Sequence, residues 1–600
     1  IKSMNMNAVR LSHYPADPEF LEACDSLGLY VECELSGWHW AHPTIVGKQL
    51  VKEMITRDEN HPSIIFWSNG NEGGFNYELE PDFAFWDKQK RVVLYPWANR
   101  NGFETKHYRS YGETQEYMRQ KEIFMPTEFL HGLYDGGHGA GLKDYWDMMM
   151  ANPRCAGGFL WDLMDQGVVR TDKNNYVDCM GNFGADGIVG PHAEKEGSYY
   201  TIKEVWCPVQ LTWNDVEKGE LTLSNQYNFV NLKDCRFSYR LLQMPAMGST
   251  QVKVLKQGNL SSPDVAPGKE AQVKIPMMAN ADAVEIKAVN HEGEEIMTWS
   301  RGVKSEERRV KNSSAPSTSS AAYADQADAV EVKAGGRTYR FAKKDGRLMG
   351  VEVGSKAISL SNGPRFMAAR RSDRSLDQFY NHDDKEAEKK KTLYTEFVDQ
   401  GAFAGFEWKE AEAKLVATYQ HGSLDEVDWQ FLSDGSVAVT CHYNFGGVVD
   451  MMGMAFDYPE SKVRSKAWVG NGPYRVWQNR EQGPQYGYWQ NDYNDPIPAE
   501  SWDYPEFKGY FANVKWMQFK TDEGKIGFSG LTADEHMGVY TPRDGRDGLL
   551  YTLPQTGLAV FKVIPSVRNK VNTTDLNGPS AQPKWLNGKG KVEFTLNFEL

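Results

Sequence analysis

The chain has 600 residues, a formal net charge of −14 and 40% hydrophobic residues. This length exceeds what one hydrophobic core supports and predicts about three or four domains. The acidic charge argues against a nucleic-acid partner and against an anionic membrane surface, and no apolar run approaches the roughly 18 residues of a membrane-spanning helix. The seven scattered cysteines contain no CxxC pair, which indicates neither a zinc cluster nor a disulfide framework.

Residues 1–205 alternate short apolar runs with charged, helical stretches, a pattern typical of βα units and a parallel sheet. A (β/α)8 barrel needs eight strands, and there is no room before residue 7 for another one. We therefore expect a barrel whose first strand is missing from this chain. The strands that we expect are seven, at 7–13, 28–35, 63–69, 91–96, 106–111, 123–128 and 157–162.

The rest of the chain is rich in short strand-like runs and turn residues. Residues 206–305 predict an immunoglobulin-like β-sandwich, because about 100 residues of this kind suit that fold. Residues 306–326 contain a Ser/Ala/Pro-rich stretch that predicts a linker. Residues 327–600 predict a large antiparallel β-sandwich.

Two glutamates follow apolar runs within the predicted barrel. Glu72 ends the stretch TRDENHPSIIFWSNGNE (56–72), directly after Asn71, and Glu128 ends IFMPTE (123–128). Strand ends at the carboxyl face are where α/β barrels place catalytic groups. Two such carboxylates are what glycoside hydrolysis requires, one to donate a proton and one to attack or to activate water.

Several motifs, in this order, resemble glycoside hydrolase family 2, specifically its large multidomain bacterial β-galactosidases. The resemblance extends over nearly the whole chain, including the C-terminal region at WVGNGPYRVWQNREQGPQYGYW (468–489) and FANVKWMQF (511–519). The barrel motifs that carry it are NAVRLSHYP (7–15), CDSLGLYV (24–31), TRDENHPSIIFWSNGNE (56–72), PTEFLHG (126–132) and GGFLWDLMDQG (157–167).

The resemblance implies a retaining mechanism with a covalent glycosyl–enzyme intermediate. It implies that Glu72 is the general acid/base and Glu128 the nucleophile. Retention requires carboxyl groups about 5–5.5 Å apart. We expect a raised pKa for Glu72, and a neighbouring Arg10 that keeps Glu128 ionised.

The resemblance also implies a set of substrate-binding residues. Asn71 would hold the 2-hydroxyl of the sugar, and an apolar floor would lie under the ring. The remaining members of this set are Arg10, His13, Tyr108, His131 and, as the floor, Trp161.

Each of these residues also has a structural interpretation. Asn71 could cap a turn, and His13 could be a satisfied structural histidine. Arg10 could pair with Glu34 as part of the scaffold. Tyr111 fits almost as well as Tyr108, Trp161 could belong to the core, and Glu128 could be structural.

One stretch departs from the family. The family has a magnesium site near the acid/base, but ELSGWHWAHP (34–43) places Trp38 and Trp40 where its ligands would lie. His39 and His42 remain, although magnesium prefers oxygen ligands. We therefore expect no assured cofactor and no assigned metal ligands, with a divalent cation left open. The two indoles instead suggest a sugar platform for a substrate other than lactose.

These observations favour an exo-acting retaining β-glycosidase, most simply a β-galactosidase. The first alternative is a β-glucuronidase or another β-glycosidase of the same family; Lys173 and Lys195 keep a uronic acid open. The second is a catalytically silent carbohydrate-binding protein. The expected partner is a carbohydrate, with no nucleic acid and no membrane. A homo-oligomer is compatible with the family, and the cellular compartment is left open.

Overall fold

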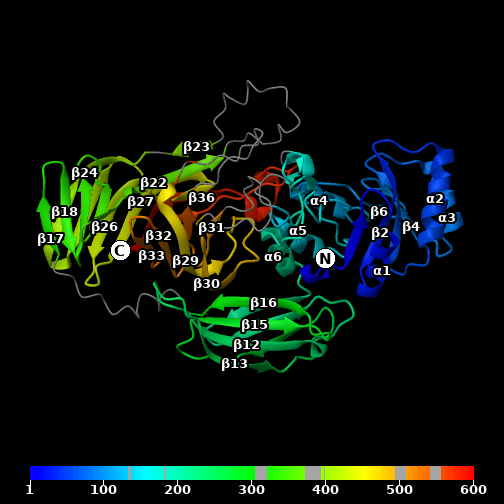
Figure 1. Ribbon diagram of the computed structural model, residues 1–600, viewed down its shortest axis with the longest axis horizontal. Coiled ribbons are helices and arrows are strands. Elements are labelled where there is room, and N and C mark those ends of the chain that lie inside the picture. The colour runs from blue at the N-terminus through cyan, green and yellow to red at the C-terminus, as the bar shows by residue number, and fades with distance from the viewer. Residues whose placement is uncertain are drawn as a thin grey trace, which may run out of the picture. The chain divides into compact units, whose positions relative to one another are not determined.

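The computed structural model describes residues 1–132, 137–180, 184–303, 321–371, 394–397, 399–493, 509–540, 554 and 556–600. The chain forms two compact units (Figure 1). The first contains Ile1–Cys207 and Val567–Ala581, and the second contains Pro208–Ser566 and Gln582–Leu600. Most of the predicted linker (304–320) lies outside the described residues.

The first unit is built on a parallel sheet with the strand order β1-β2-β3-β4. Its apolar residues pack against surrounding helices, with Val31 and Trp67 fully buried. Consecutive parallel strands joined by helices are the βα units that the sequence predicts. The strands are β1 (Ala8–Leu11), β2 (Tyr30–Trp38), β3 (Ile64–Asn71) and β4 (Val92–Leu94).

The helices of this unit follow the strands along the chain. An N-cap serine and a capping-box glutamate, Ser110 and Glu113, fix the start of α4. The helices are α1 (Pro18–Leu27), α2 (Thr44–Asp58), α3 (Glu80–Trp86), α4 (Tyr111–Met118), α5 (Leu142–Met150) and α6 (Gly197–Val205).

The later barrel segments are less regular than the sequence predicts. The expected strand at 123–128 is only Ile123–Phe124 (β7), which pairs in parallel with Phe103–Glu104 (β6). The expected strands at 106–111 and 157–162 do not form named strands; isolated bridges such as Phe129–Leu160 hold this part together. The prediction of regular strands was wrong here, because the backbone hydrogen bonds between these segments, such as that from the Phe159 N–H to the Pro126 carbonyl oxygen (3.0 Å), do not form a continuous ladder.

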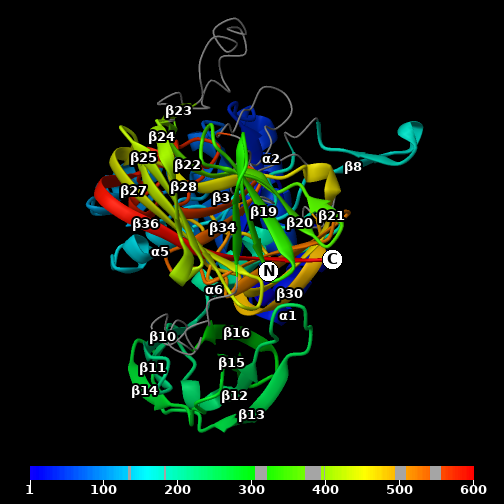
Figure 2. The ribbon, with the colours of Figure 1, turned by 90° about the vertical axis from the view of Figure 1, so that its left-hand side faces the viewer.

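Three short strands complete this unit. Asn99–Arg100 (β5) pairs with β6, and Val168–Arg170 (β8) forms a hairpin with Tyr176–Asp178 (β9). The hairpin that contains β8 projects from the rest of the first unit (Figure 2).

A segment from the end of the chain belongs to the first unit. The Asp144 carboxylate at the start of α5 accepts a hydrogen bond from the Ser580 backbone N–H (2.7 Å). Asn569 and Asn577 are buried and joined by a hydrogen bond of 2.8 Å. Gly141 leaves no room for a side chain, because a Cβ there would lie 2.9 Å from the Asn577 carbonyl oxygen. These contacts fix residues 567–581 within the unit.

The second unit begins with two small antiparallel sheets, ordered β10-β11-β14 and β13-β12-β15-β16. Ser300 in β16 is hydrogen-bonded to the Tyr486 carbonyl oxygen (2.6 Å), so these sheets are attached to the larger sandwich. The strands are β10 (Val209–Asp215), β11 (Glu220–Asn225), β12 (Arg236–Gln243), β13 (Lys253–Leu260), β14 (Glu270–Lys274), β15 (Ala283–Val289) and β16 (Glu295–Gly302).

The remainder of the second unit is a large β-sandwich around one apolar core that includes Trp429 and Trp468. One sheet has the order β17-β18-β19-β20-β22-β28-β35-β34-β31, with β21 on β20 and β23 on β22. Its strands are Ala322–Asp325, Ala329–Ala334, Arg337–Ala342, Leu348–Val353, Lys356–Ile358, Ser361–Arg371, Tyr394–Phe397, Met451–Asp457, Tyr510–Phe511, His536–Val539 and Leu558–Val563, which are β17–β23, β28, β31, β34 and β35 in chain order.

The facing sheet has the order β24-β25-β26-β27-β36-β33-β32-β29-β30. Alternate residues of β26 and β27 point into the core, as expected for a strand with one solvated face. Its strands are Ala402–Lys409, Lys414–Gln420, Leu424–Phe431, Val437–Val449, Val463–Gly472, Gln485–Asp492, Trp516–Thr521, Lys525–Ser529 and Lys584–Glu599, which are β24–β27, β29, β30, β32, β33 and β36.

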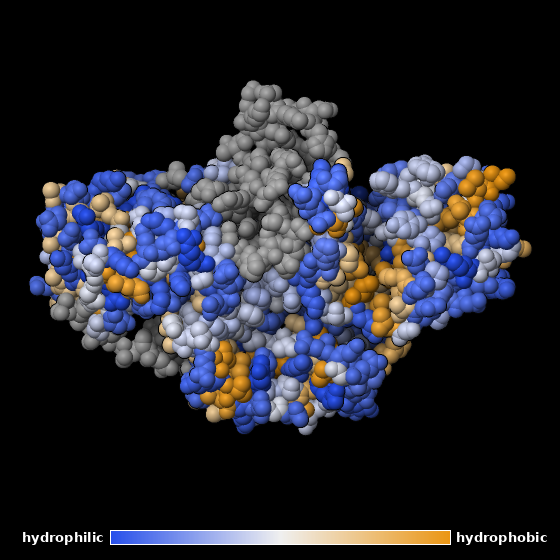
Figure 3. All heavy atoms as spheres, in the orientation of Figure 1, coloured by the Kyte–Doolittle hydropathy of each residue, from blue (hydrophilic) through white to orange (hydrophobic). Residues whose placement is uncertain are grey.

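The surface is mainly hydrophilic on the face drawn in Figure 3. Within the described parts of the chain, no helix is both long and apolar enough to cross a membrane. All seven cysteines are free thiols.

Candidate active site

Arg10, at the end of β1, is the centre of a buried ionic network. It is only 9% exposed. Its Nη1 donates to Glu128 Oε1 (2.6 Å), and its Nη2 donates to Glu34 Oε2 (2.6 Å) and Asn71 Oδ1 (2.7 Å). The planar guanidinium, with its several fixed donors, suits such a junction of carboxylates. Arg10 therefore makes both the scaffold pair and the Glu128 contact that the sequence left as alternatives.

Glu128 is held at both of its carboxylate oxygens. Arg10 donates to Oε1, and the Tyr108 hydroxyl donates to Oε2. Burial raises its pKa, but the charges of His107 and Arg10 and these two hydrogen bonds outweigh burial, so its pKa is lowered. Glu128 is thus an oriented, ionised carboxylate, as the sequence predicts. Tyr108 makes this contact, whereas Tyr111 packs edge-on against Tyr145.

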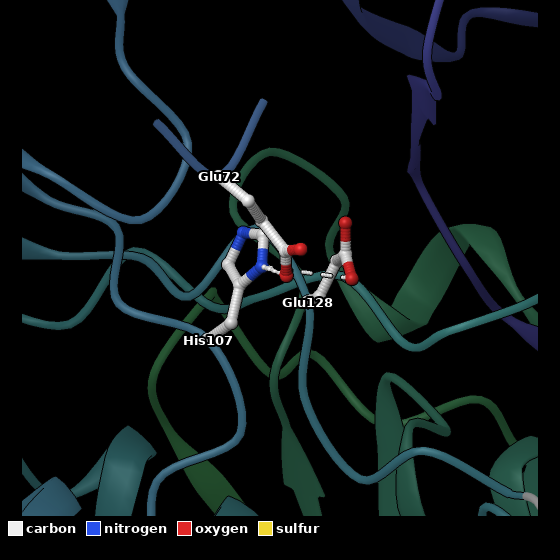
Figure 4. A group of neighbouring side chains, drawn as sticks. All are labelled: Glu72, His107 and Glu128. Atoms are coloured by element: carbon white, nitrogen blue, oxygen red, sulfur yellow. Dashed lines mark hydrogen bonds and ion pairs between the residues drawn. The ribbon is translucent and has the colours of Figure 1, made fainter. Parts of the chain in front are cut away.

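The carboxylates of Glu72 and Glu128 lie next to one another, with the His107 ring beside Glu72 (Figure 4). His107 Nδ1 lies 3.0 Å from Glu72 Oε1 and 3.5 Å from Glu128 Oε2. One carboxylate oxygen of each glutamate and this nitrogen all lie within 4.8 Å of one another. The second oxygen of Glu72 accepts a hydrogen bond of 3.0 Å from Trp38 Nε1.

The other nitrogen of His107 is also engaged. His107 Nε2 lies 2.8 Å from Thr127 Oγ1, and Thr127 Oγ1 lies 3.2 Å from the Thr105 carbonyl oxygen. These contacts fix the orientation of the imidazole, so that Nδ1 faces the carboxylate of Glu72.

The pKa of Glu72 corrects an expectation from the sequence. Burial raises it, but hydrogen bonds from His107 and Trp38 and the charges of His107 and His39 lower it to about 2. The expected raised pKa was wrong for the protein without substrate, because a linear motif does not reveal donors from other strands.

The backbone at these residues is unusual. Glu72 and Tyr108 have φ values of 45° and 50°, in the left-handed region that side chains rarely adopt. Such conformations cost on the order of 1–3 kcal/mol each and cluster at functional sites. At Gly70, a Cβ would lie 2.0 Å from the Gly74 carbonyl oxygen, so only glycine permits the turn that presents Glu72.

Aromatic and imidazole rings line one side of this network. His13 Nδ1 lies 3.0 Å from Glu34 Oε1, and the His13 ring stacks on Trp161 at a centroid distance of 5.2 Å. Trp161 Nε1 donates to Asp186 Oδ2 (3.1 Å), which also lies 3.7 Å from His131 Nε2. Trp161 is half-buried rather than a core residue.

Lys570 reaches the same side from the segment 567–581. Its Nζ lies 3.2 Å from His131 Nε2, and its backbone N–H donates to the His131 carbonyl oxygen (3.2 Å). Burial lowers the pKa of Lys570, against the charges of Asp186, Glu128 and Glu72. Burial and the Lys570 charge also lower the pKa of His131, which leaves its ring neutral.

The residues beside Glu72 do not fit the magnesium site that the family implies. The indole N–H of Trp38 points at the carboxylate, and an N–H donor cannot ligate a cation. His39 Nδ1 contacts the Glu72 carbonyl oxygen (2.9 Å), and His42 Nε2 contacts Ser36 Oγ (3.0 Å). Magnesium requires oxygen ligands in octahedral geometry, which this set does not offer.

The structure brings together the eight residues that the sequence named as catalytic or substrate-binding. They are Arg10, His13, Asn71, Glu72, Tyr108, Glu128, His131 and Trp161. Sequence reasoning missed His107 and Lys570: His107 is adjacent to Tyr108 and offered no separate signal, and Lys570 is distant in the chain. The two lysines considered for a uronic acid lie elsewhere, since Lys173 is exposed and Lys195 lies over the Tyr199 ring.

Three family descriptions match the chain. "Glycosyl hydrolases family 2, TIM barrel domain" matches residues 1–191, "Beta-galactosidase, domain 4" matches 221–298, and "Beta galactosidase small chain" matches 333–557. The barrel and the sandwiches expected from the sequence are thereby confirmed.

Relatives and solved structures are similar to this chain at low identity. A β-galactosidase from Oenococcus oeni is 22% identical over 98% of this chain and 62% of its own length. One from Clostridium acetobutylicum is 24% identical over 82% and 59%. The chain thus spans less than two thirds of these relatives. A β-glycosidase structure from Bacteroides vulgatus is 17% identical, with a TM-score of 0.30 over 62% of this chain and 54% of its own.

Proposed function

Because the chain belongs to glycoside hydrolase family 2, we propose that it is an exo-acting retaining β-glycosidase that hydrolyses terminal β-galactosides of oligo- or polysaccharides. The observation that carries this proposal is the separation of the two glutamates, whose facing carboxylate oxygens lie within 4.8 Å. Retaining glycosidases have carboxyl groups about 5–5.5 Å apart, whereas inverting ones leave about 6.5–9.5 Å for a water molecule.

The environments of the two glutamates support different roles. Glu128 is 4% exposed and fixed by Arg10 and Tyr108, which suits a nucleophile that attacks the anomeric carbon. Glu72 is more accessible and is the group that would protonate the leaving-group oxygen. In the second step the Glu72 carboxylate would take a proton from water, whose oxygen displaces Glu128 from the sugar.

Variants of the two glutamates test these roles in the full-length protein. We expect hydrolysis of nitrophenyl β-galactoside by the wild type and a loss of several orders of magnitude in Glu72→Gln and Glu128→Gln. The matched control is Glu53→Gln on the exposed face of α2, which should retain full activity.

Azide rescue separates the acid/base from the nucleophile. With Glu72→Gly, azide should attack the glycosyl–enzyme and give the β-galactosyl azide. With Glu128→Gly, azide should attack from the free face of an activated substrate and give the α-galactosyl azide. The opposite products would exchange the two assignments, and inactivity of the wild type on every β-glycoside, with sugar binding retained, would favour a silent binding protein.

A β-glycosidase for an acidic glycone is a second candidate, favoured by Lys570. Its ammonium lies beside His131 and the Trp161–Asp186 pair, so a carboxylate on the sugar would meet a fixed positive charge there. A charged Asp186 would repel a carboxylate on the sugar. Burial raises the pKa of Asp186, so this repulsion is weaker than that of an exposed aspartate.

Comparison of nitrophenyl β-glucuronide with nitrophenyl β-galactoside decides between the two substrates. If the glycone is acidic, Lys570→Met should lower kcat/KM for the glucuronide by about 100-fold and change the galactoside little. Lys173→Met, an exposed lysine of the same unit, is the control. Preference of the wild type for the galactoside would reject this second candidate.

A further inference from the structure

Trp38 occupies a defined place beside the carboxylate of Glu72. It ends β2 and pairs in register with Asn71 at the end of β3. Its Nε1 donates to Glu72 Oε2 (3.0 Å), while His107 faces Oε1. Each oxygen of Glu72 thus has its own partner, from a different strand end or loop.

The backbone beneath Trp38 fixes this geometry. A Cβ on Gly74 would lie 2.7 Å from the Gly37 carbonyl carbon and 2.8 Å from the Trp38 nitrogen. The turn that carries Glu72 and the strand end that carries Trp38 are therefore in backbone contact. The indole and the carboxylate are thus carried on adjoining backbone segments.

The ring of Trp38 is nevertheless open to solvent. Trp38 is 55% exposed, although one edge of the indole is used by the hydrogen bond. Its plane is parallel to that of His13 within 4°, at a centroid distance of 6.3 Å, and His13 stacks on Trp161. The rings of Trp161, His13 and Trp38 thus form a row that leads from the expected apolar floor of the site to Glu72 Oε2.

We propose that Trp38 positions Glu72 to protonate the leaving-group oxygen and that its exposed ring binds the leaving-group sugar. The proposal rests on the retaining β-glycosidase function proposed above. Whatever leaves must have its oxygen beside Glu72, and the atoms attached to that oxygen then lie alongside the indole. The apolar C–H face of a pyranose suits the flat apolar face of a tryptophan.

The indole also replaces what a cation would do at this carboxylate. An indole N–H is a donor only and does not ionise in the working range of pH. It favours the ionised form of Glu72, which is the form that activates water in the second step. Unlike a bound metal ion, it does so without adding a positive charge near the anomeric centre.

Other groups also act on Glu72, so a test must hold them constant. His107 and His39 face its oxygens at 3.0 and 3.6 Å. Glu128 and the Tyr108 hydroxyl lie beyond His107, and the charge of Lys570 is coupled to that of Glu72. The Trp38 ring itself packs on His39 at a centroid distance of 4.9 Å, so Trp38→Phe, which keeps an aromatic ring there, disturbs these groups least.

Two substitutions separate the N–H from the ring. Trp38→Phe removes the donor and keeps an aromatic face, and Trp38→Ala removes both. The matched control is Trp585→Phe, because Trp585 is an exposed tryptophan (73%) in β36 of the second unit and has no part in the proposed site. The substrates are β-galactosyl fluoride, whose leaving group has no ring and needs little acid assistance, and a β-galactosyl disaccharide.

The expected results differ between the variants. In Trp38→Phe, loss of one donor to the carboxylate should move the basic limb of kcat for the disaccharide, which reports the acid with substrate bound, up by about one pH unit. In Trp38→Ala, KM for the disaccharide should rise by roughly a further tenfold, while hydrolysis of the fluoride changes less than threefold. Trp585→Phe should match the wild type in both assays.

An unmoved basic limb in Trp38→Phe, or equal losses on fluoride and disaccharide in Trp38→Ala, would overturn the proposal. Failure of the proposed function looks different, since the wild type would then hydrolyse neither substrate. In that case the Trp38 indole N–H signal in ¹⁵N-tryptophan-labelled protein still decides the contact. It should shift in Glu72→Gln and on addition of the disaccharide, and a signal that responds to neither would reject both roles.

Discussion

Replacement of Arg10 by methionine should destabilise the first unit strongly and in a pH-dependent way. Arg10 satisfies Glu34, Glu128 and Asn71 and is 9% exposed. Removing one partner of a buried ion pair costs about 3–5 kcal/mol, because it leaves a buried charge uncompensated. In the variant, Glu34 would still contact His13, and Glu128 would still accept the hydrogen bond from Tyr108. We therefore expect the free energy of unfolding at pH 8 to fall by about 4 kcal/mol rather than by the sum of several such costs.

The pH dependence follows from the carboxylates that remain. Without the guanidinium, the pKa values of Glu128 and the nearby Glu32 both rise, because the charge of Arg10 lowers each of them. At pH 5 more of these groups can take up a proton in the folded state, which relieves the uncompensated charge. The loss should therefore shrink to roughly 2 kcal/mol at pH 5, at about 1.4 kcal/mol for each pH unit over which one proton is gained.

Native-state hydrogen exchange of peptides from β1, β2 and β3, in increasing urea, measures this loss in the first unit alone. The control is Arg100→Met, because Arg100 forms a partly exposed pair with Glu80 and should cost about 1 kcal/mol or less. The reasoning is refuted if the two variants lose equal stability, or if the Arg10 variant loses as much at pH 5 as at pH 8.

Three further predictions concern Glu32, Gly70 and the metal. Burial raises the pKa of Glu32 to about 7, so its contribution to stability is present below about pH 4.5 and is lost as pH rises through 7. Relative to Glu32→Gln, the wild type should therefore lose about 3 kcal/mol of unfolding free energy over that range. Urea unfolding at a series of pH values measures this loss. Gly70→Ala should cost about 2 kcal/mol or more and most of the kcat, because its Cβ would meet the Gly74 carbonyl oxygen at 2.0 Å; Gly73→Ala, whose Cβ meets nothing within 4 Å, should cost about 1 kcal/mol with kcat largely kept. EDTA followed by magnesium should change kcat/KM by less than twofold, since Trp38 faces Glu72 with an N–H; a large loss restored by magnesium would contradict this.

The sequence determined the barrel units, the β-rich remainder and the two glutamates. Apolar runs that end in Asn71-Glu72 and in Glu128 are local patterns, and strand ends of a parallel sheet meet at one edge. The side chains named from the motifs therefore gather around Arg10, as the linear order of the motifs predicts. The irregular second half of the barrel was not predictable in the same way, because the residues at 106–111 and 157–162 do not reveal where the backbone hydrogen-bond ladder between neighbouring segments is interrupted.

Only the tertiary structure decided the protonation and the boundary of the site. The low pKa of Glu72 depends on donors from two other segments, Trp38 and His107, that no periodicity connects to it. Lys570 lies 439 residues from His131 along the chain, so no local pattern could place its charge there. Local hydrophobic spacing fixes which elements form, but pKa values follow from distances between elements, and these exist only once the chain has folded.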